Sequence, residues 1–215
     1  TAKILYRIYL FFTLTEIIML KFAGLPLYDA FIHTFGTVGT GGASNMNASV
    51  GAYNNINAEV IITIFTFICG ANFTLYYQML KGDLKAPLKD EEFRFYCGAI
   101  IISIVLITIN LYGDVFESLW ESLRHSSFQV VTVMTTTGYA TTDYNNWGMF
   151  SKIVLLILMF IGGCAGSTGG ALKSIRVLLL LRIMKRELLQ IIHPRAVYAV
   201  RLGNKTVDEK TLSEI

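Results

Sequence analysis

Residues 132–147 read TVMTTTGYATTDYNNW, and residues 160–176 read FIGGCAGSTGGALKSIR. The first segment joins β-branched threonines to a glycine, and the second crowds glycines into an apolar run. Each glycine inside a helix costs up to about 1 kcal/mol relative to alanine, so the second segment predicts a break in a helix. At membrane depth, backbone outside a helix is tolerated only where it lines a cavity or is buried in protein.

The composition is that of a membrane protein. The 215 residues are 53% hydrophobic and only 15% charged, with a mean hydropathy of +0.54, whereas a soluble domain carries about a quarter charged residues. Three Cys and three Pro beside 18 Gly exclude a disulfide scaffold, a disordered region and a collagen-like repeat. We interpret the net charge of +3 as a signal of membrane orientation, and we expect no nucleic-acid partner.

Stretches without charged residues predict three membrane spans, at residues 60–80, 95–113 and 153–172. Each has about the 20 residues that a helix needs to cross the hydrocarbon core. A fourth candidate, residues 5–21, contains Glu16, which would be costly in lipid and is therefore expected to face protein. The chain does not start with Met and shows no signal-peptide cleavage site, so we expect it to begin within a longer protein.

Basic residues predict the orientation, because short cytoplasmic loops collect Lys and Arg. Residues 81–94 and the segment from Lys173 onward are rich in them, whereas residues 112–151 contain only Arg124. We therefore expect a multi-pass protein of the plasma membrane, the inner membrane of a bacterium, with residues 81–94 and 173–215 in the cytoplasm. Residues 23–57 and 113–146 then lie on the outer side.

An internal repeat relates the two outer segments. VGTGGAS at residues 38–44 aligns with TTTGYAT at residues 135–141, which pairs Gly41 with Gly138. Each motif follows an amphipathic stretch, at residues 30–37 and 116–134, and precedes an apolar span. We predict an all-α polytopic membrane protein with two repeats of transmembrane helix, re-entrant pore helix and loop, and transmembrane helix.

The re-entrant segments suit a cation. The carboxyl end of a helix that dips into the bilayer carries about half a negative charge. Thr favours extended backbone and Gly tolerates positive φ, so the Thr-Gly runs can present carbonyl oxygens that replace the hydration shell of an ion. The alternative is that both runs are turns on surface loops.

The segments at residues 132–147 and 160–176 closely resemble the Trk/Ktr/HKT superfamily of potassium-uptake proteins, and AFIHTFGTVGTGGASN at residues 30–45 fits the preceding pore loop of that family. The resemblance implies a single-chain pore of four pseudo-repeats, like a potassium channel, of which this chain is a central fragment. Residues 1–84 resemble the second repeat, residues 85–189 resemble the third with its broken last helix, and residues 190–215 resemble a cytoplasmic linker.

The resemblance also implies site residues. The potassium selectivity filter would comprise Gly39, Thr40, Gly41, Thr136, Thr137 and Gly138, acting through backbone carbonyls. The gate would be an intramembrane loop of Gly162, Gly163, Cys164, Ala165, Gly166, Ser167, Thr168, Gly169 and Gly170, with Lys173 beside it. The alternatives are that the glycines serve close helix packing and that Lys173 is an ordinary boundary lysine.

Other chemistry-bearing residues have simpler interpretations. The three cysteines lie in apolar spans without metal-site spacing, so we expect buried thiols and no bound metal or cofactor. We expect His33 and His125 to pack or to bond within the pore helices. GCAGSTGGALKS lacks the Gly-Lys-Ser of a phosphate-binding loop. Glu16 and Glu59 could be ligands for a coupling ion, but we expect Glu16 to pack against protein and Glu59 to be a residue at the membrane boundary.

The function implied is potassium transport, with K⁺ as the transported ion and no enzymatic reaction. Secondary transport of a small organic solute at a broken-helix site and an inactive structural fragment are the alternatives, and symport with protons or sodium stays open. The implied partners are membrane lipid, the remaining pore repeats, a second full-length subunit in a homodimer, and a cytosolic nucleotide-binding gating subunit. That subunit would bind the basic surface of residues 174–192, which could instead anchor on anionic lipid.

Overall fold

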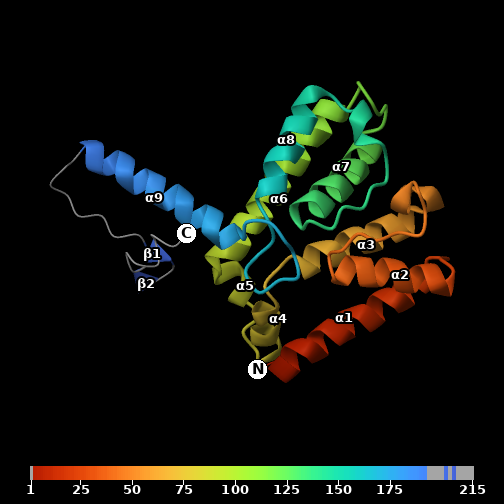
Figure 1. Cartoon of the computed structure of the whole chain (residues 1–215), viewed down its shortest axis with the longest axis horizontal. Coiled ribbons are helices and arrows are strands. Elements are labelled where there is room, and N and C mark those ends of the chain that lie inside the picture. The colour runs from red at the N-terminus through yellow and green to blue at the C-terminus, as the bar shows by residue number, and fades with distance from the viewer. Residues whose placement is uncertain (1, 193–200, 203–204, 207–215) are drawn as a thin grey trace.

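The computed structural model describes residues 2–192, 201–202 and 205–206 (Figure 1). In this part the chain is helical except for one short strand pair. The elements are α1 (Ala2–Phe22), α2 (Leu27–Val38), η1 (Ser49–Tyr53), α3 (Ile56–Cys69), α4 (Phe73–Leu80), α5 (Ala86–Lys89), α6 (Glu91–Leu111), α7 (Leu119–Met134), η2 (Tyr144–Asn146), α8 (Met149–Phe160), α9 (Ser174–Ile192), β1 (Arg201–Leu202) and β2 (Lys205–Thr206). The expected linker at residues 190–215 lies mostly outside the described residues.

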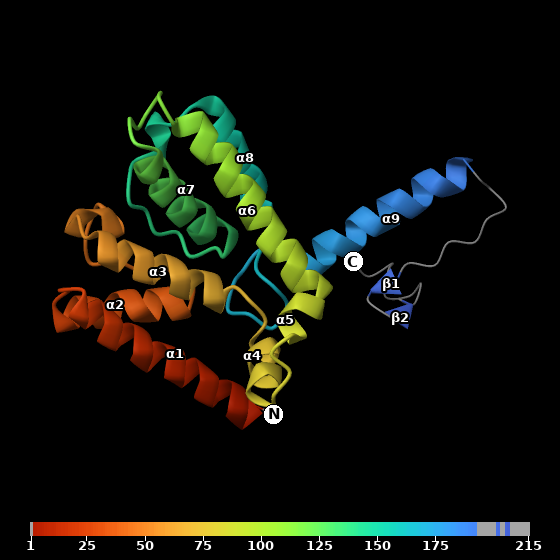
Figure 2. The same ribbon diagram turned by 180° about the vertical axis from the view of Figure 1, so that it is seen from behind.

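The helices form two groups with the same order of parts. In Figures 1 and 2, α1, α2 and α3 lie side by side, as do α6, α7 and α8, and α3 contacts α7 between the groups. Each group has a long first helix, a shorter second helix and an apolar third helix. The all-α architecture with two helix, short helix, helix units agrees with the prediction. The division between residues 84 and 85 falls in the connection between α4 and α5, and it stays a prediction.

Side-chain caps set where several helices begin. The Asp90 carboxylate accepts from the Phe93 N–H at 2.7 Å at the start of α6, and the Asn55 side chain accepts from the Ala58 N–H at 3.2 Å at the start of α3. Such caps satisfy amide groups that have no partner within the helix. The fully buried Glu16 of α1 faces protein, as the sequence predicts.

The apolar third helix is broken in both groups. Among the described helices, only α6 is long and apolar enough to cross a membrane by itself, and α3 with α4 passes the same test as a pair bent by 89°. The prediction of a continuous helix over residues 60–80 is therefore wrong. Gly70 ends α3, and the Asn72 side chain caps a new helix by accepting from the Thr74 N–H at 2.8 Å. In the second group α8 ends at Phe160, so the predicted break is confirmed.

A buried ion pair joins the two groups. A guanidinium nitrogen of Arg124 on α7 lies 2.5 Å from a carboxylate oxygen of Glu59 on α3, and both side chains are largely removed from solvent. The Arg124 guanidinium also lies 3.0 Å from Nε2 of His125. Glu59 is thus more than a boundary residue, because it ties α3 to α7.

Candidate functional site

The loops that follow α2 and α7 have the same backbone conformation. Thr40 and Thr136 have positive φ of 49° and 61°, and Gly42 and Gly138 have φ of 61° and 87°. In the first loop the N–H groups of residues 41 and 42 donate to the Gly36 carbonyl at 2.8 and 3.1 Å. In the second, those of residues 137 and 138 donate to the Thr132 carbonyl at 2.8 and 3.2 Å. We call residues 39–42 and 135–138 the two filter loops, after the role that the sequence predicts for them.

This equivalence corrects the sequence alignment by one residue. The sequence paired Gly41 with Gly138, whereas the hydrogen bonds and φ angles pair Gly42 with Gly138. The alignment matched glycine to the wrong glycine of a Gly-Gly pair, although only Gly42 has the positive φ. Sequence reasoning therefore left out Gly42 and Thr135. The Thr-x-Gly spacing that both loops share is the signal that could have found them.

The two filter loops meet directly. A Cβ atom added to Gly42 would collide with the Thr137 carbonyl, so their backbones are in contact. The buried Tyr139 reaches from the second loop to the first, where its hydroxyl lies 3.1 Å from the carbonyl oxygens of both His33 and Ala43. Its ring stacks on His33 at 5.5 Å between centroids. These contacts fix the two loops relative to each other.

Backbone and hydroxyl groups provide the chemistry at the filter loops. None of residues 39–42 and 135–138 carries a charged side chain. Gly39, Gly41 and Gly138 are exposed, and α2 and α7 end at Val38 and Met134, where their negative dipole ends face the loops. The arrangement can therefore attract a cation and offer it uncharged oxygens.

Residues 161–173 form a loop between α8 and α9 whose ends are tied together. The Gly162 N–H donates to the Leu172 carbonyl at 2.7 Å, and the Ser174 hydroxyl donates to the Gly162 carbonyl at 2.6 Å. Compact loops with closed ends hold their shape through their own contacts. We call residues 161–173 the gate loop, after the role predicted for them, because all the predicted gate residues lie in it.

The gate loop rests on the break between α3 and α4. Its Cys164 N–H donates to the Gly70 carbonyl at 2.9 Å, and its Gly166 carbonyl accepts from the Phe73 N–H at 3.3 Å. The Thr168 hydroxyl donates to the Cys69 carbonyl at 3.3 Å. Helix ends carry backbone groups without partners in the helix, so the loop satisfies the groups that the break exposes. Figure 1 shows the loop between the two helix groups.

Two charged residues hold the ends of the gate loop. One carboxylate oxygen of the buried Glu92, on α6, accepts from the N–H groups of Ala165 at 2.6 Å and Ile175 at 3.1 Å. The Lys173 ammonium donates to the Gly169 carbonyl. Lys173, the last residue of the gate loop, thus bonds back to the loop itself. The sequence did not single out Glu92, because a glutamate at the start of a predicted span resembles any boundary carboxylate.

The gate loop also touches both filter loops. The Thr40 hydroxyl lies 2.9 Å from the Thr168 carbonyl, and the Gly170 N–H donates to the Thr136 hydroxyl at 2.7 Å. The structure therefore brings the predicted filter and gate residues into one connected site.

A family model described as TrkH, cation transport protein, matches residues 1–215. The chain belongs to the TrkH family. It is 41% identical over 217 residues to the Trk system potassium uptake protein TrkH of Salmonella typhimurium and 40% identical to that of Escherichia coli K12. Each alignment covers 100% of this chain and 45% of the relative, so the chain spans less than half of the length of these relatives.

A solved structure gives the same family. The crystal structure of the potassium transporter TrkH from Vibrio parahaemolyticus matches with a TM-score of 0.94 and 35% identity, and the match covers 99% of this TrkH-family chain and 46% of that one. The resemblance inferred from residues 132–147 and 160–176 is confirmed. The fold is that of a helical membrane protein.

His33, His125 and the three cysteines of this TrkH-family chain lie in packed surroundings. His33 is buried, with Nδ1 2.8 Å from the Asp29 carbonyl and Nε2 3.1 Å from the Ser44 hydroxyl. His125 has Nδ1 2.9 Å from the Thr141 hydroxyl and stacks on Phe116. Cys69 and Cys164 are buried free thiols, and Cys97 is partly buried. Within the described residues, no group of three His, Cys, Asp or Glu could hold a metal ion.

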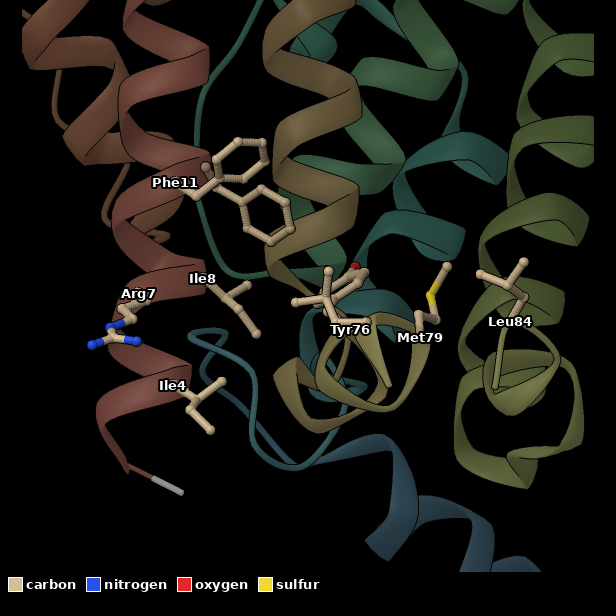
Figure 3. Close-up of a pocket in the computed structure, with 9 residues that line it drawn as sticks. Ile4, Arg7, Ile8, Phe11, Tyr76, Met79 and Leu84 are labelled. Atoms are coloured by element: carbon tan, nitrogen blue, oxygen red, sulfur yellow. The ribbon is translucent and has the colours of Figure 1, made fainter. Parts of the chain in front are cut away.

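An apolar pocket of about 580 Å³ opens between α1 and α4, away from the filter loops (Figure 3). Its lining is Ile4, Arg7, Ile8, Phe11, Phe12, Tyr76, Met79, Leu80 and Leu84. The charged group in this lining is a guanidinium, which repels cations. The pocket is therefore unsuited to a dehydrated cation, and none of its lining residues belongs to the loops at residues 39–42, 135–138 or 161–173.

Proposed function

We propose that this chain forms part of a potassium pathway across the plasma membrane, in which the filter loops bind the ion and the gate loop obstructs the path. One observation carries the proposal: two loops at the ends of α2 and α7 share one backbone conformation and meet where Gly42 contacts Thr137. Repeated backbone around a common point suits an ion coordinated by carbonyls from several loops.

The proposed ligands are the backbone oxygens of residues 39–42 and 135–138. This set keeps the predicted residues Gly39, Thr40, Gly41, Thr136, Thr137 and Gly138 and adds the two that the corrected register supplies. Potassium is the substrate, no cofactor takes part, and no covalent bond changes. The proposed gate comprises residues 162–170 with Lys173.

Secondary transport of an organic solute is less well supported. A broken-helix solute site uses free helix ends as ligands. Here the end of α3 and the start of α4 are occupied, because the carbonyls of Cys69 and Gly70 accept from the gate loop and the Phe73 N–H donates to it.

The partners follow from the same proposal. The chain spans about 45% of its relatives, so we propose that further pore loops come from the rest of a full-length protein that pairs as a homodimer. We place the cytosolic nucleotide-binding subunit on α9, where Arg176 and Lys185 are exposed. We place residues 81–94 and 173–215 in the cytoplasm of a bacterium. In Figure 1, α4 lies beside the first turn of α1, α5 and the start of α9 lie near the start of α6, and the connection from α6 to α7 lies at the opposite end of α6.

Growth at limiting potassium tests the filter. The full-length protein with Gly138→Ser is expressed in cells that lack potassium uptake. Gly138 has φ of 87° and open space around an added Cβ, so the substitution strains the loop without a collision. Gly113→Ser is a matched control, because Gly113 has φ of 86° and equally open space outside the filter. We expect cells with Gly138→Ser to fail to grow and cells with Gly113→Ser to grow. Equal growth of both variants would contradict the filter.

Potassium flux tests the gate. Deletion of residues 163–168 from the full-length protein removes the part of the gate loop that contacts the α3–α4 break. We expect potassium flux into proteoliposomes to rise, because the obstruction is gone. Flux that stays at the level of the intact protein would contradict the assignment of this loop as the gate.

A further inference from the structure

Threonine occupies the same strained position in both filter loops. Thr40 and Thr136 have φ of 49° and 61°, in the left-handed region. This region is unfavourable for β-branched residues and easy for glycine. Backbone strain that persists twice at equivalent positions points to a use of the side chain.

Each of these side chains contacts both a filter carbonyl and the gate loop. The Thr40 hydroxyl has one proton, which it shares between the Gly39 carbonyl at 2.8 Å and the Thr168 carbonyl at 2.9 Å. The Thr136 hydroxyl lies 2.6 Å from the Thr135 carbonyl and accepts from the Gly170 N–H at 2.7 Å. Gly39 and Thr135 are equivalent first residues of the two filter loops. The two hydroxyls are therefore direct links between the filter backbone and the gate loop.

The links on the gate loop are complementary. One hydroxyl reaches a carbonyl and the other receives an amide, so the loop uses both kinds of backbone group within residues 168–170. Losing a hydroxyl would leave the Thr168 carbonyl or the Gly170 N–H without that partner, which weakens the docked state.

We propose that Thr40 and Thr136 are positioning residues that latch the gate loop onto the filter, so that docking of the loop and the conformation of the filter are coupled. This inference rests on the proposed function, and it deepens it by naming how the gate is held. When the loop leaves, both hydroxyls are released toward the pathway. The competing possibility is that they act on the ion alone.

The test is the resting potassium flux of the full-length protein in proteoliposomes. Thr40→Val and Thr136→Val keep the β-branched shape and remove only the hydroxyl, and Thr40→Ser and Thr136→Ser restore it. We expect each valine variant to raise flux about threefold to tenfold, as the loss of one hydrogen bond from the docked state allows. We expect each serine variant to raise flux less than the valine variant at the same position, because serine restores the hydroxyl. Thr63→Val is the control, because the Thr63 hydroxyl bonds the Glu59 carbonyl within α3.

The same substitutions in the protein that lacks residues 163–168 separate the latch from an effect on the ion. A latch predicts no further rise in that background, because the deletion removes Thr168 and the contacts that dock the rest of the loop, including Gly170, on the α3–α4 break. An equal change of flux in both backgrounds, or a fall in both, would overturn the latch and leave the proposed function standing. Absence of potassium flux from the wild-type protein and from the deletion would instead contradict the proposed function.

Thiol labelling provides a readout of docking that does not depend on transport. Cys164 is a fully buried residue of the gate loop, so in a Cys69→Ala, Cys97→Ala background it reports whether the loop is docked. We expect a maleimide to label Cys164 faster when Thr40 and Thr136 are both valine. Labelling as slow as in the background protein would overturn the latch, even if the valine variants alter flux.

Discussion

At the level of single residues, the neighbours Gly41 and Gly42 differ in whether the fold requires glycine at their position. Gly42 has φ of 61° and no room for a Cβ beside Thr137, whereas Gly41 has an ordinary φ and open space. A residue other than glycine at position 42 would meet both backbone strain, about 1–2 kcal/mol, and a collision with backbone. The two glycines therefore distinguish the corrected register from the one inferred from sequence.

We expect Gly42→Ala to abolish potassium uptake by the full-length protein and Gly41→Ala to retain much more of it. The measurement is initial uptake in cells that lack their own potassium systems, with protein amounts matched in the membrane. A larger loss with Gly41→Ala would show that the pairing of Gly41 with Gly138 is the functional one.

The sequence predicted both loops of the candidate site but not their register. The Thr-Gly runs after two amphipathic segments indicated both loops, because threonine and glycine have distinct backbone preferences. The amino-acid sequence alone does not show whether Gly41 or Gly42 adopts the positive φ, because that depends on the packing of Thr137 against residue 42. The role of Glu92 was not predicted for a similar reason, because its partners Ala165 and Ile175 are distant in sequence.

At the level of elements, Glu92 fastens the gate loop to α6. One of its carboxylate oxygens accepts from the N–H groups of Ala165 and Ile175, which lie before and after residues 166–174. We expect Glu92→Ala to raise resting potassium flux, because both N–H groups lose a charged acceptor, a type of bond that contributes about 1.5–3 kcal/mol. Glu92→Gln retains an uncharged acceptor oxygen, so its resting flux should lie between those of the wild type and Glu92→Ala.

The neighbouring Glu91 serves as the comparison for this experiment. It forms a partly exposed ion pair with Arg182 at 3.0 Å, and exposed pairs contribute little. Glu91→Ala should therefore leave flux near wild type. If Glu91→Ala and Glu92→Ala raised flux alike, the change would come from charge near the α6 start rather than from the loop anchor.

The break between α3 and α4 depends on a missing side chain at Gly70. An added Cβ there would lie 2.6 Å from Cγ2 of Thr135 and would also meet the Tyr96 hydroxyl. We expect Gly70→Ala to lower the yield of monodisperse protein in detergent and its melting temperature. Gly98→Ala in α6 has open space and a helical backbone, so it should be neutral or slightly stabilising. Equal behaviour of the two variants would argue against close packing at this break.

The break between α3 and α4 could not be predicted from the apolar sequence of residues 60–80. Residues 60–80 look like one span, because a single glycine followed by Ala71 and Asn72 is a weak local signal. The bend is favourable only because a loop a hundred residues away supplies hydrogen-bond partners for the freed backbone. Periodicity and hydropathy carry no information about those partners. The glycine-rich break at residues 162–170 was visible because its signal is local.

For the whole molecule, the contact between the two helix groups rests partly on the Glu59–Arg124 ion pair. The side chains are 4% and 14% exposed, so removing one charge leaves the other buried without its counterion. We expect Glu59→Gln to lower the free energy of unfolding in detergent by about 3–5 kcal/mol. Lys89→Gln removes one partner of the pair with Asp83, where the side chains are 68% and 53% exposed, and should change it by less than about 1 kcal/mol. Similar losses in both variants would contradict this role of the ion pair.

The docking of the gate loop on the α3–α4 break links the proposed opening of the pathway to hydration. If the loop leaves, the carbonyls of Cys69 and Gly70 and the Phe73 N–H lose their protein partners. A buried backbone group without a partner costs about 1–3 kcal/mol, and water is the replacement at hand. The inner half of the proposed pathway must therefore fill with water as it opens. Osmotic stress that withdraws water should then favour the closed state, because hydration of a few backbone groups contributes to the free energy of opening.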